Sequence, residues 1–237
     1  MSIKSTNPAT NKVVQTFEEM TEPELEQSIA TAVETFASWK KTPYAERAAL
    51  LHKVAGLLRE NKKDLAQLIT LEMGKLLSQA EGEIKLSAEI FDYYANHAEE
   101  FLTDKVLKPV HGQALVRNSP IGVLLGVQPW NFPFYQVARF AAPNIMVGNT
   151  ILLKHASLVP QCALAIEKLY LEAGAPIGLY TNLLITGERA SELVADERIK
   201  GVSLTGSEAA GASVAAAAGK FLKKSVLELG GSDAFIV

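Results

Sequence analysis

The chain has 237 residues, a net charge of −3 and one cysteine, and 48% of its residues are hydrophobic. This length suits one large or two small domains, while the composition argues against nucleic-acid binding and provides no apolar run near the ~18 residues of a membrane-spanning helix. A single cysteine excludes an internal disulfide, and the opening residues lack the apolar segment of a signal peptide, so we expect a cytoplasmic protein.

Four helices are predicted in residues 1–104, after a short polar start. The first opens with a capping box at Thr21 and Glu24, with Pro23 in its first turn, and the others are expected at about residues 44–60, 63–73 and 77–101. None carries an obvious chemical group. The histidines are scattered singly, so we expect no metal site.

An extended segment, residues 105–120, follows the helices. His111, Gly112 and Gln113 are typical of a hairpin tip, with residues 114–117 returning as a strand. A hairpin outside the main sheet needs another surface to cover it, so we expect it to contact a partner subunit or a further part of the chain.

From residue 121 to residue 237, predicted strands and helices alternate, which indicates a parallel sheet with helices on both faces. Strands are expected at residues 122–127, 150–154, 180–185, 201–204 and 225–229, with helices at about 134–147, 160–172, 188–195 and 207–220. The predicted fold is therefore an α/β sheet of variant Rossmann type, preceded by an all-helical amino-terminal segment and an extended hairpin. The pattern G-x-G-x-x-G is absent, which argues against the standard dinucleotide fold.

Asn131 lies between Pro129 and Pro133, at the carboxyl end of the first strand of this sheet, where open α/β sheets bind ligands. An Asn amide is a neutral donor that can stabilise an oxyanion, a role worth ~10²–10³ in rate. The alternative is that Asn131 only closes a turn.

Gly206, Ser207 and Gly211 form a small loop that leads from a strand into an Ala-rich helix. Backbone N–H groups at the helix amino terminus, together with the Ser207 hydroxyl, suit a phosphate or pyrophosphate. Ala212 stands where a P-loop carries lysine, which argues against a P-loop. A tight turn without a ligand is the alternative.

Three charged side chains are further candidates. Lys154 ends a strand and could meet a ribose hydroxyl or a phosphate, although a solvated lysine is equally ordinary there. Arg139 lies eight residues after Asn131 and could bind a carboxylate in a bidentate fork, unless it is a surface arginine. Glu228 stands between leucines, where burial of an anion is costly, and this suits a general base. A buried carboxyl that pairs with a lysine is the competing account.

Together these motifs resemble the aldehyde dehydrogenase superfamily. The resemblance rests on residues 129–133 (Pro-Trp-Asn-Phe-Pro), on Gly206, Ser207 and Gly211, and on residues 227–231 (Leu-Glu-Leu-Gly-Gly). Residues 72–75 (Glu-Met-Gly-Lys) and 82–83 (Gly-Glu) resemble the family as well. The resemblance implies NAD(P)-dependent oxidation of an aldehyde to an acid. The steps it implies are formation of a thiohemiacetal on cysteine, hydride transfer and hydrolysis of a thioester.

The resemblance also implies roles for single residues. By position, Asn131 donates to the oxyanion and Glu228 activates the hydrolytic water. The residues implied at the cofactor are Pro129, Trp130, Lys154, His155, Ser157, Gly206, Ser207, Gly211 and Leu229.

The family's common pattern after the lysine is Pro-x-Glu, whereas this chain has His155, Ala156 and Ser157. Ser157 would remove a charge that repels a 2′-phosphate, so the cofactor is expected to be NADP or NAD. His155 and Arg139 resemble a bacterial group of succinate semialdehyde dehydrogenases, in which the arginine meets the distal carboxylate of the substrate.

The family's nucleophilic cysteine would lie roughly 30–35 residues beyond Glu228, outside the 237 residues. Cys162 falls in a predicted amphipathic helix, where a lone cysteine is usually a small buried hydrophobe. We therefore expect an inactive cofactor-binding portion, without its catalytic domain, of an enzyme that is a homodimer or homotetramer. The alternative is a stand-alone, non-catalytic nucleotide-binding or interaction module.

Overall fold

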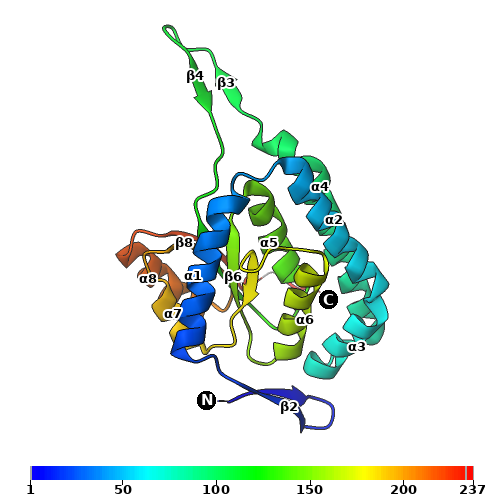
Figure 1. The fold of residues 1–237 in the computed structure, drawn as a ribbon. Coiled ribbons are helices and arrows are strands. Elements are labelled where there is room, and N and C mark those ends of the chain that lie inside the picture. The colour runs from blue at the N-terminus through cyan, green and yellow to red at the C-terminus, as the bar shows by residue number, and fades with distance from the viewer. Residues whose placement is uncertain (1, 233, 237) are drawn as a thin grey trace.

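A five-stranded parallel sheet forms the centre of the computed structural model, which describes residues 2–232 and 234–236 (Figure 1). Its strand order is β7-β6-β5-β8-β9. The strands are β5 (Val123–Gln128), β6 (Thr150–His155), β7 (Tyr180–Asn182), β8 (Ile199–Gly206) and β9 (Lys224–Leu229). The connecting helices are α5 (Tyr135–Val147), α6 (Pro160–Glu172), α7 (Gly187–Leu193) and α8 (Glu208–Lys220). The predicted α/β fold with a variant Rossmann-like sheet is confirmed.

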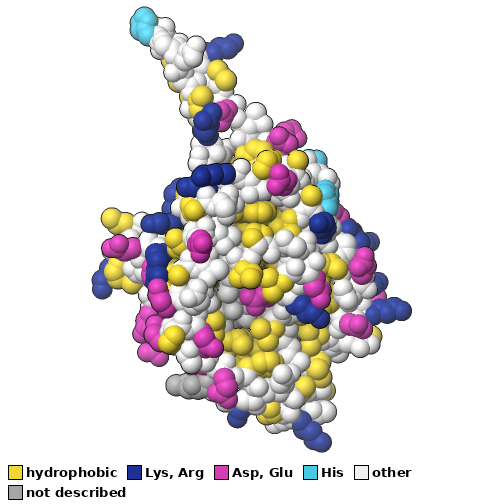
Figure 2. All heavy atoms as spheres, in the orientation of Figure 1, with side chains coloured by type: hydrophobic (Ala, Val, Ile, Leu, Met, Phe, Trp, Pro, Cys, Tyr) yellow, Lys and Arg dark blue, Asp and Glu magenta, His cyan; other side chains and the backbone are white. Residues whose placement is uncertain are grey.

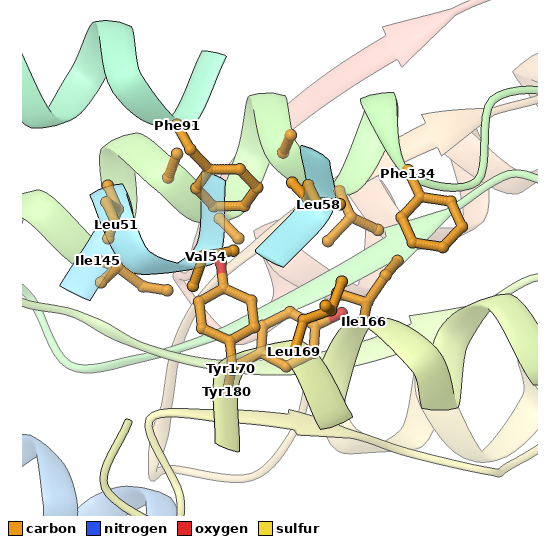
Figure 3. Close-up of a cluster of buried hydrophobic side chains, with 14 of the residues drawn as sticks. Leu51, Val54, Leu58, Phe91, Phe134, Ile145, Ile166, Leu169, Tyr170 and Tyr180 are labelled. Carbon is orange, nitrogen blue, oxygen red and sulfur yellow. The ribbon is translucent and has the colours of Figure 1, made fainter. Parts of the chain in front are cut away.

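Side chains that alternate along the strands build two hydrophobic cores, one on each face of the sheet. Ile151 and Leu153 of β6 face a core shared with α5 and α6, whereas Leu152 between them faces a core shared with α1, α7 and α8. Figure 3 shows part of the first core, where Leu51, Val54 and Leu58 meet aromatic rings from other elements. Burial on both faces explains why these strands read as continuous apolar runs.

The four amino-terminal helices are α1 (Glu22–Trp39), α2 (Tyr44–Glu60), α3 (Lys62–Met73) and α4 (Leu77–Leu102). The predicted capping box is confirmed, because Glu24 N–H donates to the Thr21 hydroxyl and Thr21 N–H donates back to the Glu24 carboxylate. Within the described residues, no helix is both long enough and apolar enough to cross a bilayer.

The amino-terminal segment is not all-helical as predicted, because it begins with a β-hairpin of β1 (Ser2–Asn7) and β2 (Lys12–Glu18). Its turn is closed by Asn11, which has a left-handed φ of 54°. Most of β2 is exposed, so the hairpin lacks the apolar alternation by which a strand is usually found in a sequence. Ile3 and Ser5 are its buried residues.

A second hairpin, β3 (Lys105–Leu107) and β4 (Ala114–Val116), confirms the extended segment predicted at residues 105–120. It projects from the body of the molecule in Figure 1, and hydrophobic side chains lie along it in Figure 2. Val106 and Val110 are 76% and 92% exposed. Residues of this kind are normally covered, so the expectation of a further contact surface stays open.

Candidate functional site

A cleft lies at the carboxyl edge of the sheet and brings together eight of the predicted residues. Because β8 and β9 are paired with Thr205 opposite Glu228, the ends of these strands are level. The cleft has a volume of about 480 Å³ and adjoins a second hollow of about 320 Å³ between α5 and the open face of β8 and β9. The predicted residues that line the cleft are Pro129, Trp130, Asn131, Arg139, Gly206, Ser207, Glu228 and Leu229.

Arg139 and Glu228, which sequence reasoning treated separately, form an ion pair of 3.2 Å. Arg139 is delivered by α5 and Glu228 by β9, and both line the cleft as well as the adjoining hollow. The expected burial of Glu228 between leucines is wrong, because its side chain is 51% exposed. In a strand, the side chains of Leu227 and Leu229 point to the opposite face, so they do not cover the carboxylate.

Ser207 is the N-cap of α8, and its hydroxyl accepts a hydrogen bond of 3.3 Å from the Ala210 N–H group. The hydroxyl hydrogen remains able to donate. Since helix amino termini attract anions, the cleft presents a favourable position for a phosphate beside Gly206 and Ser207.

Gly211, predicted at the cofactor, does not line the cleft. It lies beneath Leu229, and a Cβ atom at Gly211 would stand 2.5 Å from Leu229 Cδ2. The structure therefore explains this glycine by close packing between α8 and β9.

Lys154 and Ser157 lie outside the cleft, at the end of β6 and in the loop after it. Lys154 is 9% exposed, and burial lowers the pKa of its ammonium group. No carboxylate in the described part of the chain pairs with it. A buried cation without a partner is costly, so an anionic or hydroxyl-rich ligand would be favoured beside it.

His155 does not line the cleft, and it anchors the loop that carries Asn131. Its Nδ1 accepts a hydrogen bond from the Ala156 N–H group, so Nε2 carries the proton and donates to the Pro133 carbonyl at 2.9 Å. The ring is buried, and this burial lowers its pKa to about 4. These contacts give His155 a structural role, and its predicted contact with the cofactor stays a prediction.

The titration of His155 predicts a loss of stability in mild acid. An unfolded histidine takes up a proton near pH 6.5, whereas the folded one resists protonation down to about pH 4, so its contribution is complete above pH 6.5 and is lost as the pH falls toward 4. We expect a loss of about 3 kcal/mol in the free energy of unfolding over this window. Urea unfolding from pH 7 to 4.5 measures it.

The matched variant for this measurement is His155→Gln, whose amide still donates to the Pro133 carbonyl but does not titrate. Its unfolding free energy should depend less on pH than that of the parent protein. Equal pH dependence in both proteins would assign the acid sensitivity to other groups.

Cys162 is a buried thiol in the first turn of α6. Burial, with the neighbouring Glu72 carboxylate, raises the pKa of this thiol well above its usual range. Glu72 accepts hydrogen bonds from the N–H groups of Gln161 and Cys162 at 3.0 and 2.9 Å. A protonated, enclosed thiol is a poor nucleophile, which agrees with its interpretation as a small buried hydrophobe.

Sequence reasoning missed two groups that shape the site. Gln136 lines the cleft, and its side-chain oxygen lies 3.5 Å from the Arg139 guanidinium. Glu83, from α4, accepts hydrogen bonds from the N–H groups of Phe134 and Tyr135 at the start of α5. The Gly-Glu motif at residues 82–83 is visible in the sequence, but nothing local indicates what its carboxylate contacts.

The comparisons with known proteins agree with this geometry. The sequence model of the protein family described as "Aldehyde dehydrogenase family" matches residues 1–237. A succinate-semialdehyde dehydrogenase [NADP(+)] of Deinococcus radiodurans is 51% identical over 98% of the chain and 48% of the relative. A probable succinate-semialdehyde dehydrogenase [NADP(+)] of Synechocystis is 51% identical over 100% of the chain and 52% of the relative.

Among solved structures, the succinic semialdehyde dehydrogenase of Streptococcus pyogenes in complex with NADP+ superposes with a TM-score of 0.96. It is 47% identical, over 98% of this chain and 51% of that one. The chain thus spans about half the length of the curated relatives it matches. With the whole of its length matched by one family model, the chain belongs to the aldehyde dehydrogenase family.

Proposed function

We propose that the 237 residues form the cofactor-binding portion of an NADP-dependent succinate-semialdehyde dehydrogenase. The observation that carries the proposal is the Arg139 guanidinium, which stands in the same cleft as Asn131 and already holds a carboxylate there, that of Glu228, at 3.2 Å. A substrate with an aldehyde at one end and a carboxylate at the other suits this pair of groups. The relatives, which are named as NADP-dependent succinate-semialdehyde dehydrogenases, support the same substrate and cofactor.

The residues present suit a dinucleotide with a 2′-phosphate. Lys154 is a buried cation without a partner among the described residues, and Ser157 nearby adds no negative charge that would repel a phosphate. Gly206 and Ser207 would hold the pyrophosphate at the amino terminus of α8, while Pro129, Trp130 and Leu229 would line the nicotinamide side. When bound, this cofactor accepts the hydride.

The protein's own groups supply proton and charge chemistry around that transfer. The Asn131 amide would donate a hydrogen bond to the substrate oxygen as negative charge develops on it. Glu228 would take the proton of the hydrolytic water, and its exposure leaves it accessible to water. Since Cys162 is enclosed, we infer that the nucleophile lies outside these 237 residues and that they are inactive by themselves.

Replacing Arg139 by alanine in the full-length enzyme should remove most of its preference for succinate semialdehyde over butanal. A hydrogen-bonded carboxylate contact is worth about 1.5–3 kcal/mol, so we expect a roughly 10- to 100-fold fall in the ratio of the two kcat/KM values. Steady-state kinetics with both aldehydes measures the ratio. Arg59→Ala, on the exposed surface of α2, is the control and should leave the ratio unchanged.

Unchanged discrimination in Arg139→Ala would remove Arg139 from substrate recognition. A full-length protein that binds NADP but oxidises neither aldehyde would favour the alternative of a non-catalytic binding module.

The exposed hairpin β3–β4 supports a further part of the proposal, assembly as a homodimer or homotetramer. Its apolar side chains would be covered by another subunit, and the mass of the full-length protein in solution by light scattering tests this. A cytoplasmic location stays a prediction.

A further inference from the structure

We propose that the buried ion pair between Lys75 and Glu83 positions the Asn131 amide for catalysis. This inference rests on the proposed function, in which Asn131 is the oxyanion donor. Neither Lys75 nor Glu83 lines the cleft, so both would act as positioning residues through the loop of residues 129–133, hereafter the Asn131 loop.

Glu83 holds the carboxyl side of the Asn131 loop. The first N–H groups of a helix have no partner within it, and Phe134, the N-cap of α5, provides no side-chain cap. Glu83 supplies the missing acceptor from α4, because its Oε1 accepts from Phe134 N–H at 2.9 Å and Tyr135 N–H at 3.2 Å. Its negative charge also opposes the positive end of the α5 dipole.

Lys75 makes this buried carboxylate stable and holds the loop at a second point. Its Nζ lies 2.5 Å from Glu83 Oε2, and both side chains are nearly inaccessible to solvent. The same Nζ stands 3.5 Å from the centre of the Phe132 ring, a cation–π contact. Phe132 directly follows Asn131, so the ammonium group joins the loop to the Glu83 cap.

Contacts therefore hold the consecutive residues that directly follow Asn131, whereas Asn131 itself is exposed. Lys75 contacts Phe132, His155 binds the Pro133 carbonyl, and Glu83 caps the two residues after it. The Asn131 side chain makes no hydrogen bond within the described residues. The position of its amide then depends on the backbone that carries it, and a misplacement of about 1 Å can cost about 10²-fold in rate.

A double-mutant cycle in the full-length enzyme tests the inference with the variants Lys75→Met, Asn131→Ala and their combination. We expect Lys75→Met to lower kcat by about 10- to 100-fold in the parent enzyme. In the Asn131→Ala background it should lower kcat less than about twofold, because the group through which it acts is gone. Lys75→Arg keeps the charge and the contact with the ring, and should restore kcat to within about threefold of the parent.

The matched control is Lys62→Met. Lys62 of α3 pairs with Glu81 of α4 at 3.0 Å, close in the chain to the buried pair but on the exposed surface, so its loss should leave kcat unchanged. A second variant, Phe132→Leu, removes the ring contact and leaves the buried pair intact, so it keeps the test decisive if Lys75→Met does not fold. It should also lower kcat in the parent and not in the Asn131→Ala background.

The positioning role would be overturned if Lys75→Met lowered kcat by the same factor in the parent and in the Asn131→Ala background. A general structural effect acts independently of Asn131 and would give this result. An unaltered kcat in both Lys75→Met and Phe132→Leu would overturn it as well. These results differ from failure of the proposed function, which would appear as little or no loss in Asn131→Ala alone.

Discussion

Replacing Asn131 by alanine is expected to lower kcat of the full-length enzyme by about 10²–10³, the largest effect on activity that we predict. The amide is exposed to the cleft, and its backbone is held by the contacts of Phe132 and Pro133. A donor placed before the reaction does not have to reorganise as the oxyanion forms, so its loss acts on the transition state more than on substrate binding. Single-turnover kinetics of hydride transfer measures the loss directly.

Asn131→Asp is the sharper companion, since it keeps the shape and replaces a donor by a negative charge. It should lose at least as much activity as the alanine variant, while NADP affinity in both stays near that of the parent. A fall in kcat of less than about threefold in Asn131→Ala would contradict the oxyanion role. An Asn131→Asp variant as active as the parent enzyme would contradict it as well.

Replacing Arg47 by methionine should produce the largest loss of stability, about 3–5 kcal/mol in the free energy of unfolding. The buried guanidinium donates to the carbonyls of Met146, Trp39 and Lys40 at 2.8, 3.2 and 3.0 Å. These carbonyls stand at the carboxyl-terminal ends of α5 and α1, where helix dipoles favour a cation. Methionine fills similar space but leaves three acceptors unsatisfied.

Urea unfolding followed by tryptophan fluorescence measures this change, because Trp39 lies at the same junction and donates to the Ile145 carbonyl at 3.1 Å. Arg47→Lys should lose less stability than Arg47→Met, since an ammonium group keeps the charge but does not reach all three carbonyls. The control is Arg59→Ala, where the arginine is half-exposed. A loss below about 1 kcal/mol in Arg47→Met would show that the junction is held mainly by apolar packing.

Much of the fold was predictable because apolar periodicity reports burial. Leu152 and its neighbours in β6 are apolar without alternation, and this pattern is typical of a strand covered on both faces. The hairpin β1–β2 was missed for the converse reason, because an exposed ribbon is not required to show apolar alternation. The domain boundaries remain predictions.

The candidate site was predictable to a different degree on each strand. Asn131, Ser207 and Glu228 follow or end predicted strands, and the ends of parallel strands meet at one edge, so their convergence was expected. His155 also ends a strand, yet its side chain contacts Pro133 behind the loop. Chain position shows which edge a residue occupies, whereas the pleat decides which face its side chain reaches.

The sequence by itself determined that the chain is a parallel α/β sheet, because the spacing of its apolar residues and turns admits few other arrangements. Its motifs also indicated which side chains would gather at the carboxyl edge. Only the tertiary structure decided which groups pair. Glu228 pairs with Arg139 at this edge, and Glu83 pairs with Lys75 and with the start of helix α5 outside the cleft. A buried or half-buried charge pairs with a group that packing brings near it, and that group is 51 residues away for Glu83 and Phe134. A contact between residues so far apart in the chain cannot be predicted from the residues next to either of them.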